Sequence, residues 1–391
     1  MAKKKKDQTT GIPLVRTSER GDFKRCPFLW DVSWNKGLTS KRSPTWSWFG
    51  TAIHKGLEAY YIPGKKRAKV SKMIDAFDEA LEGEVRKVYT AGGDINQEEF
   101  YGDPDMQIVG GRELGIAMLR GYVDHYGIES EWEVIHPEQS FQIDVADPND
   151  ESKVLATYAG TWDLLAWNRV SKKFWLWDHK TRKTFLTDWS YLELNDQAGS
   201  YLWVAPEVLR ALGIFNKKDQ IEGIIFNYLR KRMPDERPLG PDGMAHNLPK
   251  KEHFVEALDA KGIGYPQRAT LATLKEHAER NKIEVWGDVS ARQPAPLYHR
   301  EEVYRSQVER VTQARRVQAE VAHMQAMRAG TLPIYKTPTE DCVRCSIFDY
   351  CVLHESDPEA AKVLAGEIMR SRDPYADHRE SFVKGGVSVH G

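Results

Sequence analysis

Residues 158–183 read YAGTWDLLAWNRVSKKFWLWDHKTRK, two apolar runs joined by a short turn at 168–171. Aromatic and aliphatic runs of this length between turn residues are typical of buried strands. A third such run precedes them at 131–146, so the pattern predicts a meander of three strands. Each predicted strand carries one carboxylate, namely Glu138, Asp163 and Asp178.

Helical patterns surround this predicted meander. Apolar residues recur at helical spacing in 70–89, 106–127, 194–213 and 300–330. The last of these ends at Gly330, a helix stop signal. Residues 221–232 read as a further strand. The order of helices, meander, helix and strand predicts an α+β or α/β core.

The composition shifts divide the chain into five parts. We expect a disordered basic tail, a core that includes an N-terminal cysteine, an insertion rich in Pro, Gly and charge, a C-terminal helix with a cysteine cluster, and a flexible tail. Their expected boundaries are 1–12, 13–232, 233–300, 301–356 and 357–391.

The overall charge excludes a globally basic nucleic-acid-binding protein. The 391 residues carry a formal net charge of −1, so any site for a polyanion must be local. The chain contains no apolar run long enough to span a bilayer, and no apolar region follows the lysine-rich start. These features predict a soluble cytoplasmic protein that does not bind membranes.

The four cysteines suggest a metal or cluster site. They are Cys26 near the start and Cys342, Cys345 and Cys351 in EDCVRCSIFDYC. Disulfides are disfavoured in a cytosolic protein, so the three clustered thiols, with Cys26 as fourth ligand, favour metal binding. Zinc is one alternative, but zinc sites usually pair two Cys-x2-Cys knuckles and only one is present. An iron-sulfur cluster, for which four thiolates are a common ligand set, is therefore preferred.

Asp178 and Lys180 suggest phosphate chemistry. Two residues apart on a strand, their side chains project to the same side. Mg²⁺ or Mn²⁺ prefers oxygen ligands, and two carboxylates with a backbone carbonyl suit either ion. Such an ion can activate a water and neutralise charge on a phosphoryl oxygen, while Lys180 orients that water or stabilises the charge. The alternative is an ordinary surface ion pair.

These segments carry a family resemblance. GTWDLL followed by WLWDHKT resembles the motifs of PD-(D/E)-x-K nucleases. FGTAIHKGLEAYY, PEQSFQI and DQAGSYLW resemble the G-x-x-x-H helix, the Glu-bearing strand and the Q-x-x-x-Y helix of the RecB-like branch. The one-plus-three cysteine layout is similar to that of its iron-sulfur members, including CRISPR-associated and phage-encoded nucleases. The resemblance omits the insertion.

The resemblance implies a restriction-endonuclease-like α/β core, with a mixed central sheet flanked by helices, a helical N-terminal part and a C-terminal iron-sulfur region. The implied cofactors are Mg²⁺ or Mn²⁺ and a [4Fe-4S] cluster bound by Cys26, Cys342, Cys345 and Cys351. The implied metal ligands are His54, Glu138, Asp163, Asp178 and the carbonyl of His179. The implied catalytic set is Asp163, Asp178, Lys180, Gln197 and Tyr201.

One residue departs from the family pattern. His179 stands between Asp178 and Lys180, where the family usually has an apolar residue. Because the family uses the backbone carbonyl at this position, we expect the ring of His179 to point away from the metal.

The implied activity is exonucleolytic hydrolysis of DNA at its ends, including single-stranded ends, in bacterial or phage recombination, repair or CRISPR-type processing. A recombinase or CRISPR-type adaptation protein is the implied further partner, in a bacterial cell or phage-infected host. Candidate DNA-binding residues are Arg182, Lys183, Arg230 and Lys231. The alternatives are a non-cleaving DNA-binding recombination partner and a site-specific endonuclease.

Overall fold

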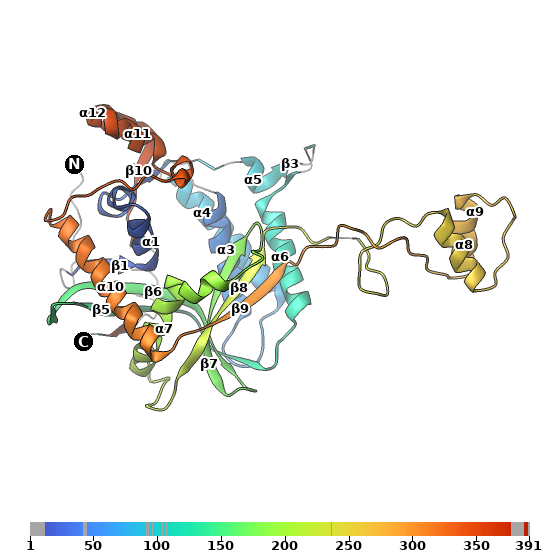
Figure 1. The fold of residues 1–391 in the computed structure, drawn as a ribbon, viewed down its shortest axis with the longest axis horizontal. Helices are drawn as coiled ribbons and strands as arrows, with labels where there is room; N and C mark the ends of the chain where they lie inside the picture. The colour runs from blue at the N-terminus through green and yellow to red at the C-terminus, as the bar shows by residue number, and fades with distance from the viewer. Residues whose placement is uncertain are drawn as a thin grey trace. The chain divides into compact units, whose positions relative to one another are not determined.

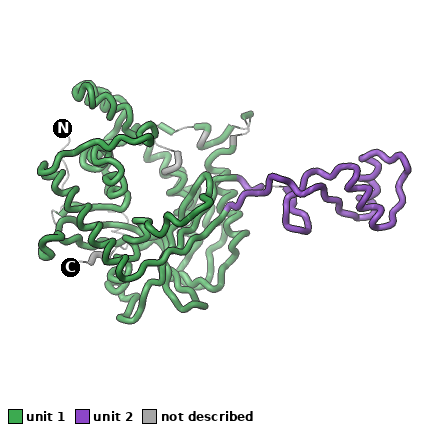
Figure 2. The backbone as a smooth tube through the Cα atoms, in the orientation of Figure 1, with its two compact units in different colours: residues 1–232, 298–391 green, residues 233–297 purple. Residues whose placement is uncertain are grey.

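The computed structural model describes residues 12–41, 45–90, 92, 94–95, 97–103, 105–106, 108–235, 237–376 and 387–389. Except for residue 12, the expected basic tail lies outside these ranges. Chain contacts divide the protein into two units, residues 1–232 with 298–391 and residues 233–297, coloured separately in Figure 2. Within the described ranges, every helix is too short or too polar to cross a lipid bilayer.

The first unit is built on a seven-stranded sheet with the order β11-β5-β6-β7-β8-β9, and β1 pairs with β6 in addition. Its strands are β1 (Leu14–Arg16), β5 (Trp132–Asp147), β6 (Asp150–Asn168), β7 (Lys173–Arg182), β8 (Ile221–Arg230), β9 (Tyr298–Tyr304) and β11 (Val387–Val389). The predicted meander is β5, β6 and β7, paired antiparallel, whereas β7 and β8 are parallel. The predicted mixed α/β architecture is confirmed.

Three helices cover one face of this sheet (Figure 1). They are α1 (Thr17–Arg25), α7 (Asp196–Ala211) and α10 (Gln307–Arg328). Helix α7 makes the crossover that a parallel strand pair requires. It buries Ala198, Leu202, Ala205 and Leu209 against the sheet, at the three- to four-residue spacing of an amphipathic helix. The apolar spacing therefore fixes which side of α7 meets the sheet.

The other face is covered by α3 (Thr45–Tyr60), α4 (Val70–Thr90) and α6 (Gly111–Tyr126). Helices α4 and α6 approach each other closely at Gly115. A Cβ atom there would lie 2.1 Å from the ring of Phe77, so only glycine permits this contact. The two helix layers cover both faces of the sheet. A functional site is therefore expected at the ends of the strands.

Smaller elements complete the first unit. They are α2 (Pro27–Trp30), the π-helical turn η1 (Asp31–Asn35), β2 (Leu38–Ser40), α5 (Gln97–Tyr101), β3 (Gly102–Asp103), β4 (Ile108–Val109), and the 3₁₀ turns η2 (Ser190–Leu194) and η3 (Glu340–Arg344). They are joined by α11 (Phe348–Ser356), α12 (Pro358–Ile368) and β10 (Met369–Ser371).

The expectation of a flexible tail over 357–391 needs correction. Residues 358–371 form α12 and β10, and β10 pairs antiparallel with β2. Ala361 and Met369 are buried in a small core with Phe28, Leu29 and Tyr350. Residues 387–389 pair in parallel with β5. The polar appearance of this segment hid these few apolar contacts.

The second unit has a core of its own. Helices α8 (Lys251–Ala260) and α9 (Leu271–Arg280) bury Phe254, Leu258 and Leu274 against each other. It occupies most of the expected insertion at 233–300. The predicted helix at 300–330 starts later, because residues 298–304 form β9 beside β8 and α10 begins after the capping residue Ser306.

Candidate active site

The candidate site lies where β6 and β7 separate. Their pairing ends at Leu164 and Trp177, whereas β7 stays paired with β8 as far as Arg182. The backbone N–H of His179 has lost its partner on β6, and it donates instead to Asp163 Oδ2 at 2.6 Å. The carboxylate thus replaces a strand carbonyl and is held at the opening between the strands.

Glu138 on β5 lies in register with this opening. Pro137 pairs with Leu164 and Gln139 with Trp162, so Glu138 falls opposite Asp163. Its backbone has a φ of 49°, in the left-handed region. That conformation costs a non-glycine residue about 1–2 kcal/mol, and such strain is enriched at functional sites. The strain is consistent with a carboxylate that the chain directs into the opening.

His54 completes a group of three possible metal ligands. It reaches the site from α3, and its Nδ1 lies 3.3 Å from Asp163 Oδ1. One donor atom from each of His54, Glu138 and Asp163 lies within 4.8 Å of the others, which holds for no other such triad in the described chain. One imidazole and two carboxylates form a donor set that suits Mn²⁺ or Mg²⁺.

The protonation of this triad is strongly perturbed. Burial opposes a charge on His54, but the Asp163 carboxylate raises the pKa of His54 to about 9. Burial and the nearby Asp163 charge raise the pKa of Glu138 to about 7. Although burial favours neutral Asp163, the His54 charge holds the pKa of Asp163 well below its usual range. Without a cation, the triad therefore holds protons that a metal ion would displace.

Asp178 and Lys180 form the second part of the site. Lys180 Nζ lies 2.6 Å from Asp178 Oδ2. Gln197 on α7 bridges the pair, because its Oε1 accepts from Lys180 Nζ and its Nε2 donates to Asp178 Oδ1, both at 2.9 Å. Tyr201 follows one turn later, with its hydroxyl 3.1 Å from Gln197 Nε2, and donates to the carbonyl of Thr161 at 2.7 Å. The site thus brings the predicted catalytic set together.

The environment of Asp178 fits a cation. Its carboxylate is buried, and its partners among the described residues are Lys180 Nζ, 2.6 Å from Oδ2, and Gln197 Nε2, which donates to Oδ1. Burial raises the pKa of Asp178, Lys180 opposes that rise and Asp163 adds to it. Asp178 lies outside the compact triad, but a buried carboxylate that is repelled by a second carboxylate is suited to a positive ion.

The ring of His179 takes no part in this acidic group. It stacks on Tyr61, and its Nδ1 lies 2.9 Å from Asn227 Nδ2, which can only donate. Burial lowers the pKa of His179 to about 3, so the ring is neutral. Arg300 fixes the Asn227 amide by donating to Oδ1 at 3.1 Å. The His179 side chain is therefore a buried hydrogen-bonding group of β7 that contacts Asn227 and Tyr61.

The four candidate DNA-binding residues lie at the ends of β7 and β8. Arg182 stacks over Trp189, Tyr191 and Tyr228, and Lys231 stacks over Phe49. Among the described residues, no carboxylate forms an ion pair with Arg182, Lys183, Arg230 or Lys231. Burial and the charge of Lys183 lower the pKa of Lys231. Uncompensated cations therefore gather on strands that adjoin the candidate site.

The four cysteines are less clearly arranged as metal ligands than the acidic triad. Cys26, Cys345 and Cys351 pack against one small apolar core, and all four thiols are free. Burial raises the pKa of Cys345, and the neighbouring Cys26 and Cys342 add to that effect. However, the thiols form no compact group of ligands in the described chain. The predicted iron-sulfur region is not shown.

Two residues of the site escaped the sequence prediction. Lys55, next to His54, lies 3.6 Å from Glu138 and also pairs with Glu58. Asn227 is fully buried beside His179. Asn227 is a lone polar residue in the apolar run IIFNYL, and that break in pattern is a signal that could have identified it.

Comparison with known proteins gives one family. Residues 18–352 match the family model described as the PD-(D/E)XK nuclease superfamily. No curated protein shows a significant match to the chain. The family match covers most of the chain and includes every site residue described above.

Proposed function

The chain belongs to the PD-(D/E)XK nuclease superfamily, and on that basis we propose that it is a metal-dependent deoxyribonuclease that hydrolyses phosphodiester bonds at DNA ends. The observation that carries this proposal is the Asp178–Gln197–Lys180 arrangement beside the triad of His54, Glu138 and Asp163.

The cation would be held by His54, Asp163, Asp178 and the carbonyl of His179, with Glu138 close to them. When bound, Mg²⁺ or Mn²⁺ supplies Lewis acidity, which lowers the pKa of a water and neutralises phosphate charge. The burial of Asp178 and the mutual repulsion of the carboxylates support this assignment.

The protein's own residues place the Lys180 ammonium. Gln197 Oε1 and Asp178 Oδ2 hold it from two sides, and its side chain remains 35% exposed. A fixed cation at a partly open site is suited to stabilise negative charge that develops on a phosphate oxygen, because it needs no reorganisation during the reaction. Tyr201 holds the Gln197 amide in the orientation that this contact needs.

The neighbouring cations supply the affinity for DNA. Arg182 and Lys183 follow Lys180 on the same segment, and Arg230 pairs in register with Arg182. Because no described carboxylate neutralises them, they are free to meet backbone phosphates. Among the rings around Arg182, the exposed ring of Tyr191 is suited to contact the bases of a strand end.

The resemblance to RecB-like iron-sulfur nucleases suggests a more specific activity and a second cofactor. We propose exonuclease activity in bacterial or phage recombination, repair or CRISPR-type processing, and a [4Fe-4S] cluster on Cys26, Cys342, Cys345 and Cys351. A four-iron cluster is larger than one ion, so its thiolate ligands lie farther apart than those of a zinc site. The shared apolar core beneath three of the cysteines supports this proposal.

Purified protein should be incubated with end-labelled linear DNA and covalently closed circular DNA, with Mn²⁺ or with EDTA. Metal-dependent loss of label from linear DNA alone supports an exonuclease. Discrete fragments from both substrates indicate an endonuclease, and binding without cleavage indicates a recombination partner. Labels on the 5′ or 3′ end give the polarity.

The cluster needs its own measurement. Protein purified anaerobically should contain iron and acid-labile sulfide if the four thiolates bind a cluster. Replacing Cys345 by Ser should remove both. Zinc without iron in the purified protein would contradict the cluster assignment.

A further inference from the structure

We propose that Arg20 of α1 is a positioning residue for the active site. Together with Gln313 of α10, it fixes the rotation of α7 about its own axis and thereby the hydrogen bonds of Gln197. This inference rests on the proposed nuclease function, because one of its readouts is DNA cleavage.

Arg20 is buried among polar partners. Its side chain is fully inaccessible. Nε lies 2.6 Å from Glu320 Oε2, Nη2 lies 2.8 Å from Asp196 Oδ1, and Nη1 donates to Ser200 Oγ at 3.0 Å. A planar guanidinium with three partners sets directions as well as distances. Two of the three partners, Asp196 and Ser200, belong to α7.

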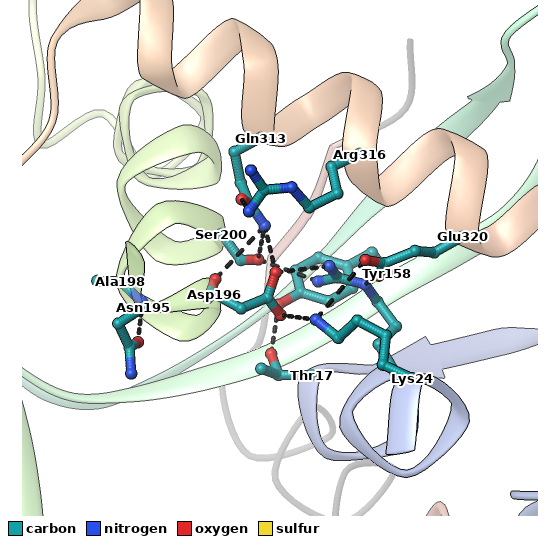
Figure 3. Close-up of polar contacts among 11 residues, drawn as sticks. Thr17, Lys24, Tyr158, Asn195, Asp196, Ala198, Ser200, Gln313, Arg316 and Glu320 are labelled. Atoms are coloured by element: carbon teal, nitrogen blue, oxygen red, sulfur yellow. Dashed lines mark hydrogen bonds and ion pairs between the residues drawn. The ribbon is translucent and has the colours of Figure 1, made fainter. Parts of the chain in front are cut away.

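Gln313 holds the same two residues from α10. Its Nε2 donates to Asp196 Oδ1 at 2.6 Å and to Ser200 Oγ at 3.0 Å. Figure 3 shows Asp196 and Ser200 on α7 facing Gln313, with Lys24 reaching the other oxygen of Asp196 at 3.0 Å. We call Arg20, Asp196, Ser200, Gln313 and Glu320 the α7 clamp.

The clamp and the active site use adjacent positions of one helix. Asp196 and Ser200 are four residues apart, and Gln197 and Tyr201 follow each of them by one residue. In an α-helix, one residue corresponds to a rotation of about 100°. The clamped face and the active-site face are therefore neighbouring faces of the same turns, and a rotation that fixes one also fixes the other.

The active-site contacts depend strongly on this rotation. Gln197 makes two hydrogen bonds of 2.9 Å, to Lys180 and to Asp178. At the outer radius of a helix, a rotation of about 20° displaces a side-chain end by about 2 Å, which breaks such bonds. Apolar burial determines which side of α7 faces the sheet, and the directional contacts of the clamp then restrict the remaining rotation.

A buried ion cluster is weak evidence for stability, since apolar residues of similar volume often stabilise as well. The contacts to Asp196 and Ser200 add directionality, which restricts the rotation of α7 more closely than apolar burial alone. The clamp therefore has a positional role in addition to any contribution to folding.

The test compares Arg20→Gln and Arg20→Lys in the full chain with Leu209→Ala. Leu209 is fully buried on α7 but belongs to the apolar core, so its truncation lowers stability without changing the clamp. At a temperature where all variants are folded, Arg20→Gln should lower kcat about 100-fold with little change in KM for DNA. Arg20→Lys should restore part of this loss, and Leu209→Ala should keep kcat within threefold of the parent.

A double-mutant cycle with Gln197→Ala tests whether Arg20 affects cleavage through Gln197. If Arg20 acts through Gln197, adding Arg20→Gln to Gln197→Ala should lower kcat no further. Fully additive losses, or equal losses of kcat in Arg20→Gln and Leu209→Ala, would overturn the inference.

A third readout is independent of cleavage. Amide exchange across 198–201, compared between the parent and Arg20→Gln, should accelerate in the first turns of α7 and stay unchanged in α3. If the parent protein cleaves no DNA, the proposed function fails, and faster exchange still supports the clamp. Unchanged exchange in α7 overturns the positioning role whether or not the protein cleaves DNA.

Discussion

The α7 clamp and the candidate metal site are two charged groups that contact adjacent faces of one helix. The pKa values of their carboxyl groups are shifted in opposite directions. In the clamp, Asp196 faces Arg20 and Lys24, and although burial opposes ionisation, these cations lower its pKa. In the metal site, burial raises the pKa of Asp178, and that of Glu138 rises to about 7. In the clamp the neighbouring cations outweigh the effect of burial on the carboxylate pKa, whereas at Asp178 and Glu138 the effect of burial prevails.

This difference separates a structural group from a binding group. Both contain buried carboxylates, so neither residue type nor burial distinguishes them. The distinguishing features are carboxyl pKa values that stay raised at Asp178 and Glu138 despite nearby cations, and a left-handed backbone at Glu138. Replacing a charged carboxylate by a neutral amide should therefore destabilise the protein at the clamp and stabilise it at the metal-free candidate site.

The largest effect should come from Lys180→Ala, which removes the fixed cation of the site. We expect cleavage of end-labelled linear DNA to fall about 1000-fold, because charge that forms on the phosphate is no longer stabilised. Lys173→Ala is the matched control, since Lys173 lies on the same strand but pairs with Glu222. More than a tenth of the parent rate in Lys180→Ala would remove Lys180 from the mechanism.

Neutralising the clamp with Asp196→Asn should destabilise the fold by about 2 kcal/mol, because buried Arg20 loses one of its two charged partners. Urea unfolding measures this change as a lower midpoint with an unchanged slope. Glu207→Gln on the same helix is the control. Its ion pair with Arg210 is exposed, and the expected cost is about 0.5 kcal/mol or less. Equal effects in the two variants would contradict a buried role for Asp196.

Mn²⁺ affinity should rise with pH. The pKa of Glu138 is about 7 and that of His54 about 9, so both groups hold protons at pH 6 that the ion must displace. For each proton released, affinity rises by up to about tenfold per pH unit and levels off above the higher pKa. Calorimetric titrations from pH 6 to 9 measure this slope, and Glu138→Gln should flatten it around pH 7. An affinity independent of pH would argue against the triad as the binding site.

The smallest effect should be a gain in stability from Glu138→Gln in the presence of EDTA. Burial raises the folded-state pKa of Glu138 to about 7, well above that of an exposed glutamate, so ionising this acid at pH 8 destabilises the folded state. Removing the charge should increase the free energy of unfolding by about 1 kcal/mol at pH 8. The gain should disappear near pH 4, where the carboxyl is protonated in both states. Urea unfolding at both pH values measures it, and a loss at pH 8 would show that the charge is compensated.

The parts of the site that depend on neighbouring residues in the sequence could be predicted. Apolar runs between turn residues predicted β5, β6 and β7, and the Q-x-x-x-Y spacing of Gln197 and Tyr201 is that of one helix face. The opening between β6 and β7 was not predictable, because it depends on where pairing stops. The strain at Glu138 was also hidden, since nothing in PEQSFQI requires a positive φ.

Long-range contacts account for most of what was missed. Arg20 and Glu320 are separated by 300 residues, and no local pattern in TSERGDFKR indicates a buried arginine. Likewise, Val387–Val389 pairs with β5 although its surrounding sequence is polar. Such contacts follow from the three-dimensional path of the chain.

The wide separation of the clamp residues along the chain has a consequence for the order of events during synthesis. The ribosome releases Arg20, Asp178, Lys180 and Gln197 well before Gln313 and Glu320. At typical elongation rates, the delay is on the order of ten seconds. During that interval α7 lacks the apolar and polar contacts that α10 provides, so the candidate site residues are made before the clamp can form. A site that depends on the clamp therefore becomes complete late, when nearly all of the protein has been made.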